Sequence, residues 1–236
     1  MKRFKTEYYA DGANIKDIIE GNKNNKIKGF TTNPSLMKSS GVKNYTKFAK
    51  QILKIVKKKP VSFEIFADDA EEIESQARII ASWGKNVFVK IPIINTKGIS
   101  NAELIGKLNK ENIKLNVTAV FLPSQSKEVI KYIGKKTEII ISVFAGRIAD
   151  SGKDPVIELN KHIKLSKNFK NIKILWASVR EPFNLIQAQK IGCHIITVPE
   201  EILKKTKNFN KNLFKYSKET VKMFYNDAKK SGFSLK

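Results

Sequence analysis

Lys90 is the residue whose surroundings point most directly to chemistry. It lies in an apolar run at 86–94, where an unpaired charge is costly to bury. If this run is a strand, alternation puts Phe88 and Lys90 on one face and the β-branched residues on the other. A desolvated lysine has a lowered pKa, and its neutral amine can attack a ketone to form a Schiff base. The alternative is a structural lysine whose ammonium reaches solvent or pairs with Glu64.

Two carboxylates and three neutral side chains could assist such a reaction. Cleaving a carbon–carbon bond beside an imine requires a group that takes and returns protons, and Asp11 and Glu64 are candidates for it. The alternative for this pair is a salt-bridged role at a barrel rim. Asn33, Asn116 and Ser142 could bind sugar hydroxyls, although each could equally serve as a loop or cap residue.

A third group of residues could bind an anion. Arg147 follows one predicted strand, and Ser178 and Arg180 follow the next. Pro182 favours a helix start close to Ser178, and helix N-termini attract phosphate. This chain is dominated by lysine, so its use of arginine at these two places suggests a phosphate site.

The elements that must position these residues alternate along the chain. Short β-branched or aromatic runs predict strands at 7–10, 27–31, 61–66, 86–91, 114–119, 138–144, 172–177 and 194–198. Helical periodicity predicts helices at 15–20, 43–57, 70–83, 102–111, 124–132, 155–169, 182–190, 200–206 and 212–230.

This alternation predicts an α/β protein, a single (β/α)8 TIM barrel with an additional C-terminal helix. In such a barrel the active site lies where strands end, and each of the first seven strands brings a polar group there. An open doubly wound sheet is the alternative, but no Gly-x-Gly-x-x-Gly follows the first strand. With no composition break, residues 1–236 are expected to form one domain. The stripe of Val221, Phe224, Tyr225 and Ala228 should pack on the barrel or on a neighbouring subunit.

Composition narrows the function classes. The net charge of +23 comes mostly from scattered lysines, which are typical of solvated faces and would attract anionic substrates. A basic nucleic-acid-binding barrel is the non-enzymatic alternative, although no nucleic-acid motif is present. Two histidines and the single Cys193 argue against a metal site or a disulfide. The basic start at 1–5 precedes no signal-like segment, and no run approaches the roughly 18 apolar residues of a membrane span. We therefore expect a cytoplasmic protein.

Several motifs in order resemble those of the transaldolase family, in its short form related to bacterial fructose-6-phosphate aldolases. Any single motif is weak, but the combination is highly specific and runs from about Tyr8 to the C-terminus. The motifs are Asp11-Gly12-Ala13-Asn14, Gly29-Phe30-Thr31-Thr32-Asn33-Pro34-Ser35, Ser62-Phe63-Glu64, Val89-Lys90-Ile91-Pro92, Asn116-Val117-Thr118-Ala119 with Gln125, Ile141-Ser142-Val143-Phe144-Ala145-Gly146-Arg147-Ile148 and Trp176-Ala177-Ser178-Val179-Arg180.

The resemblance implies a class I aldol mechanism without a cofactor. Lys90 would form the imine with a ketose phosphate, and Asp11 would take the C4 hydroxyl proton as the C3–C4 bond breaks. Glu64 and Thr118 would hold a water that shuttles protons. The remaining implied roles are hydroxyl binding by Asn33, Asn116 and Ser142, and phosphate binding by Arg147, Ser178 and Arg180.

The resemblance also bears on subtype and assembly. Fructose-6-phosphate aldolases carry Gln where Glu64 stands and Tyr where Phe144 stands, so both residues favour transfer of the three-carbon unit over its release. Gly12 replaces a usual Thr or Ser, and Leu122-Pro123 occupies a loop where Ser is common. These departures leave open whether the donor and acceptor are the usual sugars of the pentose phosphate pathway or sugars outside that set. Short members form ring-stacked decamers, which implies a homo-oligomer here.

Overall fold

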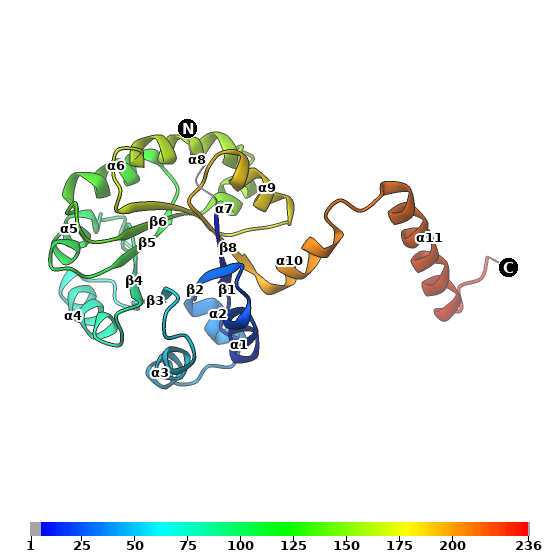
Figure 1. The fold of residues 1–236 in the computed structure, drawn as a ribbon, viewed down its shortest axis with the longest axis horizontal. Helices are drawn as coiled ribbons and strands as arrows, with labels where there is room; N and C mark the ends of the chain where they lie inside the picture. Colours follow the sequence, from blue (N-terminus) through cyan, green and yellow to red (C-terminus); the bar gives the residue numbers. More distant parts are fainter. Residues whose placement is uncertain (1–5, 236) are drawn as a thin grey trace. The chain divides into compact units, whose positions relative to one another are not determined.

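The computed structural model describes residues 6–235 and consists mainly of a closed barrel of eight parallel strands (Figure 1). Each strand pairs with its neighbours in chain order, and β1 pairs with β8 to close the ring. The predicted barrel is therefore confirmed, and the doubly wound alternative is excluded. The strands are β1 Glu7–Asp11, β2 Ile27–Thr31, β3 Val61–Glu64, β4 Val87–Pro92, β5 Leu115–Val120, β6 Ile139–Val143, β7 Ile172–Trp176 and β8 Ile195–Pro199.

Helices follow the strands, and α1 to α9 form the outer layer of the barrel (Figure 1). They are α1 Ile15–Lys23, α2 Pro34–Ser39, α3 Tyr45–Ile55, α4 Ala70–Ala81, α5 Ala102–Lys110, α6 Pro123–Tyr132, α7 Ala145–Asp150, α8 Pro155–Ser166, α9 Phe183–Lys190, α10 Glu200–Lys205 and α11 Leu213–Lys230. The sequence interpretation missed α2 and α7. Each has six residues, too few for helical periodicity to show.

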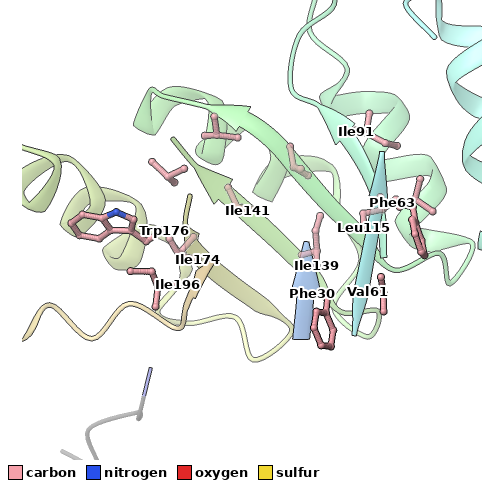
Figure 2. Close-up of a cluster of buried hydrophobic side chains, with 14 of the residues drawn as sticks. Phe30, Val61, Phe63, Ile91, Leu115, Ile139, Ile141, Ile174, Trp176 and Ile196 are labelled. Atoms are coloured by element: carbon pink, nitrogen blue, oxygen red, sulfur yellow. The ribbon is translucent and has the colours of Figure 1, made fainter. Parts of the chain in front are cut away.

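Alternate residues of the strands face two different cores. The outward side chains pack under the helices, as Figure 2 shows for Phe63, Ile91 and Leu115. The inward cluster contains Phe88, and Lys90 follows it two residues later on the same face. The predicted alternation along β4 is thus confirmed. Each fully buried aliphatic or aromatic side chain contributes roughly 1.5–3 kcal/mol, so the outward core holds the strand ends in place.

Apolar side chains fill the barrel axis below the strand ends. Tyr9, Phe88, Ile140, Leu175 and Ile195 form this inner cluster. Gly29 on the neighbouring strand makes room for the Tyr9 ring, because a Cβ there would lie 2.5 Å from its Cε2 atom. A residue with a side chain at 29 would therefore displace the Tyr9 ring.

The C-terminal residues from Lys204 form a compact unit separate from the barrel unit that ends at Leu203. Within it, α11 is amphipathic, and none of its residues is buried. Val221, Phe224 and Tyr225 of the predicted stripe are 63%, 62% and 59% exposed, and Phe214, seven residues before Val221, extends the stripe and is 81% exposed. What covers this stripe stays a prediction.

The described residues, 6–235, lack two features that would indicate other functions. None of the helices described there is long and apolar enough to cross a membrane. That part of the chain also has no group of three His, Cys, Asp or Glu side chains placed to hold a metal ion. The basic start discussed above, 1–5, lies outside the described residues.

Candidate active site

A cavity of about 500 Å³ opens at the carboxyl ends of the strands. All the residues predicted for the site line it except Asn116, which lies beneath it. The predicted residues in its lining are Asp11, Asn33, Glu64, Lys90, Thr118, Ser142, Phe144, Arg147, Ser178 and Arg180. They come from strand ends far apart in the sequence, which closure of the barrel brings to one rim.

Lys90 lies at the base of this cavity and is 6% exposed. Its Nζ is 3.0 Å from Glu64 Oε2 and donates a hydrogen bond to the Thr32 carbonyl oxygen, also at 3.0 Å. The neighbouring strands align Glu64 with Lys90 in register, which accounts for the contact. The ion pair anticipated by the structural alternative therefore exists. It also gives the ammonium a carboxylate that can take its proton, and a neutral amine is what nucleophilic attack requires.

Asp11 ends β1 and lines the same cavity. Its Oδ1 accepts a hydrogen bond from the Thr31 hydroxyl at 2.8 Å. Burial raises the pKa of Asp11, while the Lys90 charge and the Thr31 hydrogen bond lower it in part. A carboxyl group whose pKa is raised toward neutrality is a better proton acceptor and donor than an ordinary one, so Asp11 suits acid–base work.

The Thr118 hydroxyl is a buried polar group that could bind a ligand or a water. Its Oγ1 is buried at the cavity lining and has no hydrogen-bond partner within the part of the chain that the structure describes. A buried hydroxyl without a partner is costly, so a water or a substrate hydroxyl would be stabilised there. Thr118 lies on β5, the strand next to β4, and is in register with Pro92, two residues beyond Lys90.

Asn116 and Ser142 form part of a buried network rather than acting separately. Ser142 Oγ donates to Asn116 Oδ1 at 2.6 Å, and Asn116 Nδ2 donates to Ser62 Oγ at 2.9 Å. Asn116 is fully buried and does not line the cavity, whereas Ser142 does. In this arrangement Asn116 fixes the orientation of the Ser142 hydroxyl.

Asn33 has a structural task as well as a place in the cavity lining. Its Oδ1 accepts a hydrogen bond from the Leu36 amide at 2.9 Å and caps α2, with Pro34 at the first helical turn. Because the carbonyl oxygen is the capping atom, the Nδ2 amide is the group that Asn33 could offer to a ligand.

The aromatic wall of the cavity is apolar. Phe144 caps α7 and packs against Phe121, with ring centroids 5.8 Å apart at an interplanar angle of 41°. Phe144 brings no hydroxyl to the cavity, so this wall holds no proton donor.

The residues predicted for an anion site, Arg147, Ser178 and Arg180, line the same rim of the cavity. Gly146, the second residue of α7, lies so close to the segment after β7 that a Cβ would be 1.6 Å from the Ser178 carbonyl oxygen. Ser178 has a φ of 60°, which is unusual for a residue other than glycine. Arg180, about half exposed, forms an ion pair with Asp150 at the end of α7, which the sequence did not predict.

The helix start after Pro182 does not supply free amides in the way the sequence suggested. The first helical residue of α9 is Phe183, and the Arg180 and Glu181 amides already donate to Asn184 Oδ1. The cationic side chains in the cavity lining at this rim are Arg147 and Arg180.

Sequence reasoning missed several contributors to the site. Thr31, Thr197 and Ser62 are buried hydroxyls that face the interior, and Thr31 and Thr197 line the cavity. Strand alternation could have found them, because each lies an even number of residues from an interior residue of its strand. Asp150 carried no comparable signal.

Comparisons with known proteins agree with this geometry. The family profile described as Transaldolase/Fructose-6-phosphate aldolase matches residues 8–235. A Dehalococcoides mccartyi protein named "Probable transaldolase" is 35% identical over 197 residues, covering 83% of this chain and 87% of the relative. One of the same name from Thermoplasma volcanium is 37% identical over 200 residues, covering 83% and 85%. The fold is similar to that of a Coccidioides immitis protein assigned as a fructose-1,6-biphosphate aldolase, with a TM-score of 0.53, 10% identity and coverage of 88% and 82%.

Proposed function

The chain belongs to the transaldolase/fructose-6-phosphate aldolase family, and we propose that it is a transaldolase that works through a Schiff base on Lys90. It would move a dihydroxyacetone unit from a ketose phosphate, such as fructose 6-phosphate or sedoheptulose 7-phosphate, to an aldose phosphate. One observation carries the proposal: the buried Lys90 amine opens on a cavity with Glu64 at 3.0 Å and Asp11 in the same lining.

The first step makes the imine. Glu64 takes a proton from Lys90, and the neutral amine attacks the ketose carbonyl carbon, C2. Protonation of the resulting hydroxyl releases water and leaves an iminium ion. The Thr118 hydroxyl, which has no partner among the described residues, would hold that water near Glu64; both residues line the cavity.

The second step breaks the bond. Asp11 takes the proton from the C4 hydroxyl, the C3–C4 bond electrons move into the iminium, and an aldose leaves. The remaining three-carbon enamine stays on Lys90. Its C3 then attacks the aldehyde carbon of the acceptor, Asp11 returns its proton to the new alkoxide, and water releases the product ketose.

Transfer requires that water does not free the three-carbon unit first. Phe144 presents an apolar ring at the cavity where a tyrosine could activate water, and this favours transfer. An aldolase that frees dihydroxyacetone is the second candidate. Measuring free dihydroxyacetone with and without an aldose acceptor separates the two, because release without acceptor would favour the aldolase.

The phosphate would lie against Arg147, Arg180 and Ser178 at the rim. The Nε and one terminal nitrogen of Arg180 already donate hydrogen bonds to Asp150. The phosphate would therefore share the Arg180 guanidinium with Asp150. Nucleic acid is not favoured by any feature of this site.

Borohydride trapping tests the proposal. Reduction in the presence of fructose 6-phosphate, followed by peptide mass mapping, should find a three-carbon adduct on Lys90. The variant Lys90→Met should trap nothing, while Lys114→Met should trap normally. Lys114 is a suitable control because it immediately precedes β5 at the opposite end of the barrel, where it pairs with Glu138. Normal transfer by Lys90→Met would remove the Schiff base.

We also propose that the protein is a cytoplasmic homo-oligomer, a decamer by resemblance, in which the stripe on α11 packs against another copy. Support comes from the exposure of Phe214 and Phe224 on one side of that helix. Light scattering should give a smaller mass for Phe214→Asp/Phe224→Asp. The control Lys230→Glu, on the opposite side of α11, should keep the native mass, and an unchanged mass for both would refute the role of the stripe.

A further inference from the structure

Thr197 in β8 is a buried residue that the mechanism above does not use. It points into the barrel on the same side of the strand as Ile195 of the inner cluster. Its hydroxyl lies within hydrogen-bond distance of Thr31 Oγ1. Thr31 Oγ1 in turn contacts Asp11 Oδ1 at 2.8 Å. Three side chains from three strands thus form one continuous chain of contacts that ends at the carboxylate.

The donors in this chain follow from counting hydrogens. An ionised carboxylate only accepts, so the single Thr31 proton points to Asp11. Thr31 then has lone pairs but no hydrogen for Thr197, so Thr197 must donate to Thr31. The direction is therefore fixed from β8 to β2 to β1 whenever Asp11 is ionised.

Strand order explains why this chain ends at Asp11. β1 lies between β2 and β8, and Asp11 is in register with Thr31 on one side and with Pro199 on the other. The two hydroxyls come from the strands that flank β1; Thr31 contacts the Asp11 carboxylate, and Thr197 contacts Thr31. Hydrogen bonds in series polarise one another in a buried setting, so the outer donor strengthens the inner one.

We propose that Thr197 is a positioning residue, whose hydroxyl orients Thr31 so that Asp11 presents its second oxygen, Oδ2, to the reacting substrate hydroxyl. This inference rests on the proposed function, because it assigns Asp11 the proton transfer. Thr197 acts through Thr31 and takes no part in bond making.

Thr197→Val removes the hydroxyl and keeps the volume, and Thr197→Ser keeps the hydroxyl. We expect Thr197→Val to lower kcat about tenfold, a fraction of the full effect of acid–base catalysis, with little change in KM. The acid limb of the kcat/KM profile should move to higher pH, because a weaker donor chain stabilises the Asp11 anion less. Thr197→Ser should restore both quantities, and Thr137→Val, preceding β6 at the other end of the barrel, should change neither.

The double variant Thr31→Val/Thr197→Val separates this role from a general structural effect. If Thr197 acts only through Thr31, the double variant should be no slower than Thr31→Val alone. Multiplied effects of the two substitutions, or an unmoved acid limb in Thr197→Val, would overturn the proposal.

A second readout does not depend on activity. Carboxyl ¹³C titration by NMR should show a higher pKa for Asp11 in Thr197→Val than in the wild-type protein, and Asp11→Asn identifies the resonance. An identical Asp11 titration in both proteins would overturn the inference whatever the enzyme does. Failure of the wild-type protein to trap a three-carbon unit on Lys90 would instead refute the proposed function.

Discussion

Replacing Lys90 with Met should affect stability as well as activity, and by an amount that the ion pair with Glu64 sets. The Lys90 and Glu64 side chains are 7% and 15% exposed, and their charged atoms are 3.0 Å apart. Removing one partner of a fully buried pair costs about 3–5 kcal/mol, because it leaves a buried charge alone. Glu64 lines a cavity that water can enter, so we expect about 2 kcal/mol. For a chain of this length, that lowers Tm by about 4–8 °C.

Scanning calorimetry on Lys90→Met, Glu64→Gln and the double variant measures this. The double variant should be more stable than Lys90→Met, because it removes the unpaired carboxylate along with the amine. Lys114→Met serves as the charge-matched control. Its pair with Glu138 is more exposed, at 38% and 52%, so it should lose less than about 1 kcal/mol. A double variant less stable than Lys90→Met would refute the reasoning, because the Glu64 carboxylate would then stabilise the folded protein even without Lys90.

Four further outcomes are expected. Asp11→Asn should reduce kcat by about 10²–10⁴-fold, and the wild-type kcat/KM should fall with acid at a pH above the ordinary Asp pKa of about 4, since burial raises the pKa of Asp11; a rate that persists to lower pH would contradict this. Arg180→Ala should raise KM for phosphorylated donors far more than for dihydroxyacetone, and equal effects in steady-state kinetics would exclude a phosphate role. Gly146→Ala should lower both Tm and activity, because its Cβ would lie 1.6 Å from the Ser178 carbonyl oxygen; a normal Tm would show that the contact relaxes freely. Burial lowers the pKa of His162 to about 4, so the unfolded chain takes up a proton first as the pH falls. The free energy of unfolding should therefore decrease by up to about 3 kcal/mol between pH 6.5 and 4. Chemical denaturation should find this decrease reduced in His162→Leu.

The barrel could be predicted because its strands are short β-branched runs separated by periodic helices. Side chains alternate between the two faces of any strand, so the inward direction of Phe88 and Lys90 could be predicted from the local sequence alone. The six-residue helices α2 and α7 were missed because so few residues give only a weak periodic signal. The Asn33-Pro34 pair was nonetheless a cap and first-turn signal for α2, and it could have been recognised as such.

The finer geometry of the site depends on closure, which local patterns do not encode. The Thr31–Thr197 contact joins residues 166 apart, and only pairing of β1 with β8 brings them together. The Arg180–Asp150 pair likewise depends on how α7 approaches the end of β7. Types of residue at strand ends were thus predictable, while their partners were not.

The filled barrel axis also constrains the order of events. Tyr9, Phe88 and the other inner side chains occupy the space below Lys90, so among the described residues the reactants' route to the amine is from the rim. The cavity of about 500 Å³ would take donor and acceptor in turn, so the first aldose would leave before the acceptor binds. The proposed enzyme should therefore show ping-pong kinetics, because donor and acceptor bind in the same cavity. Excess acceptor should inhibit the reaction by occupying that cavity before the donor binds.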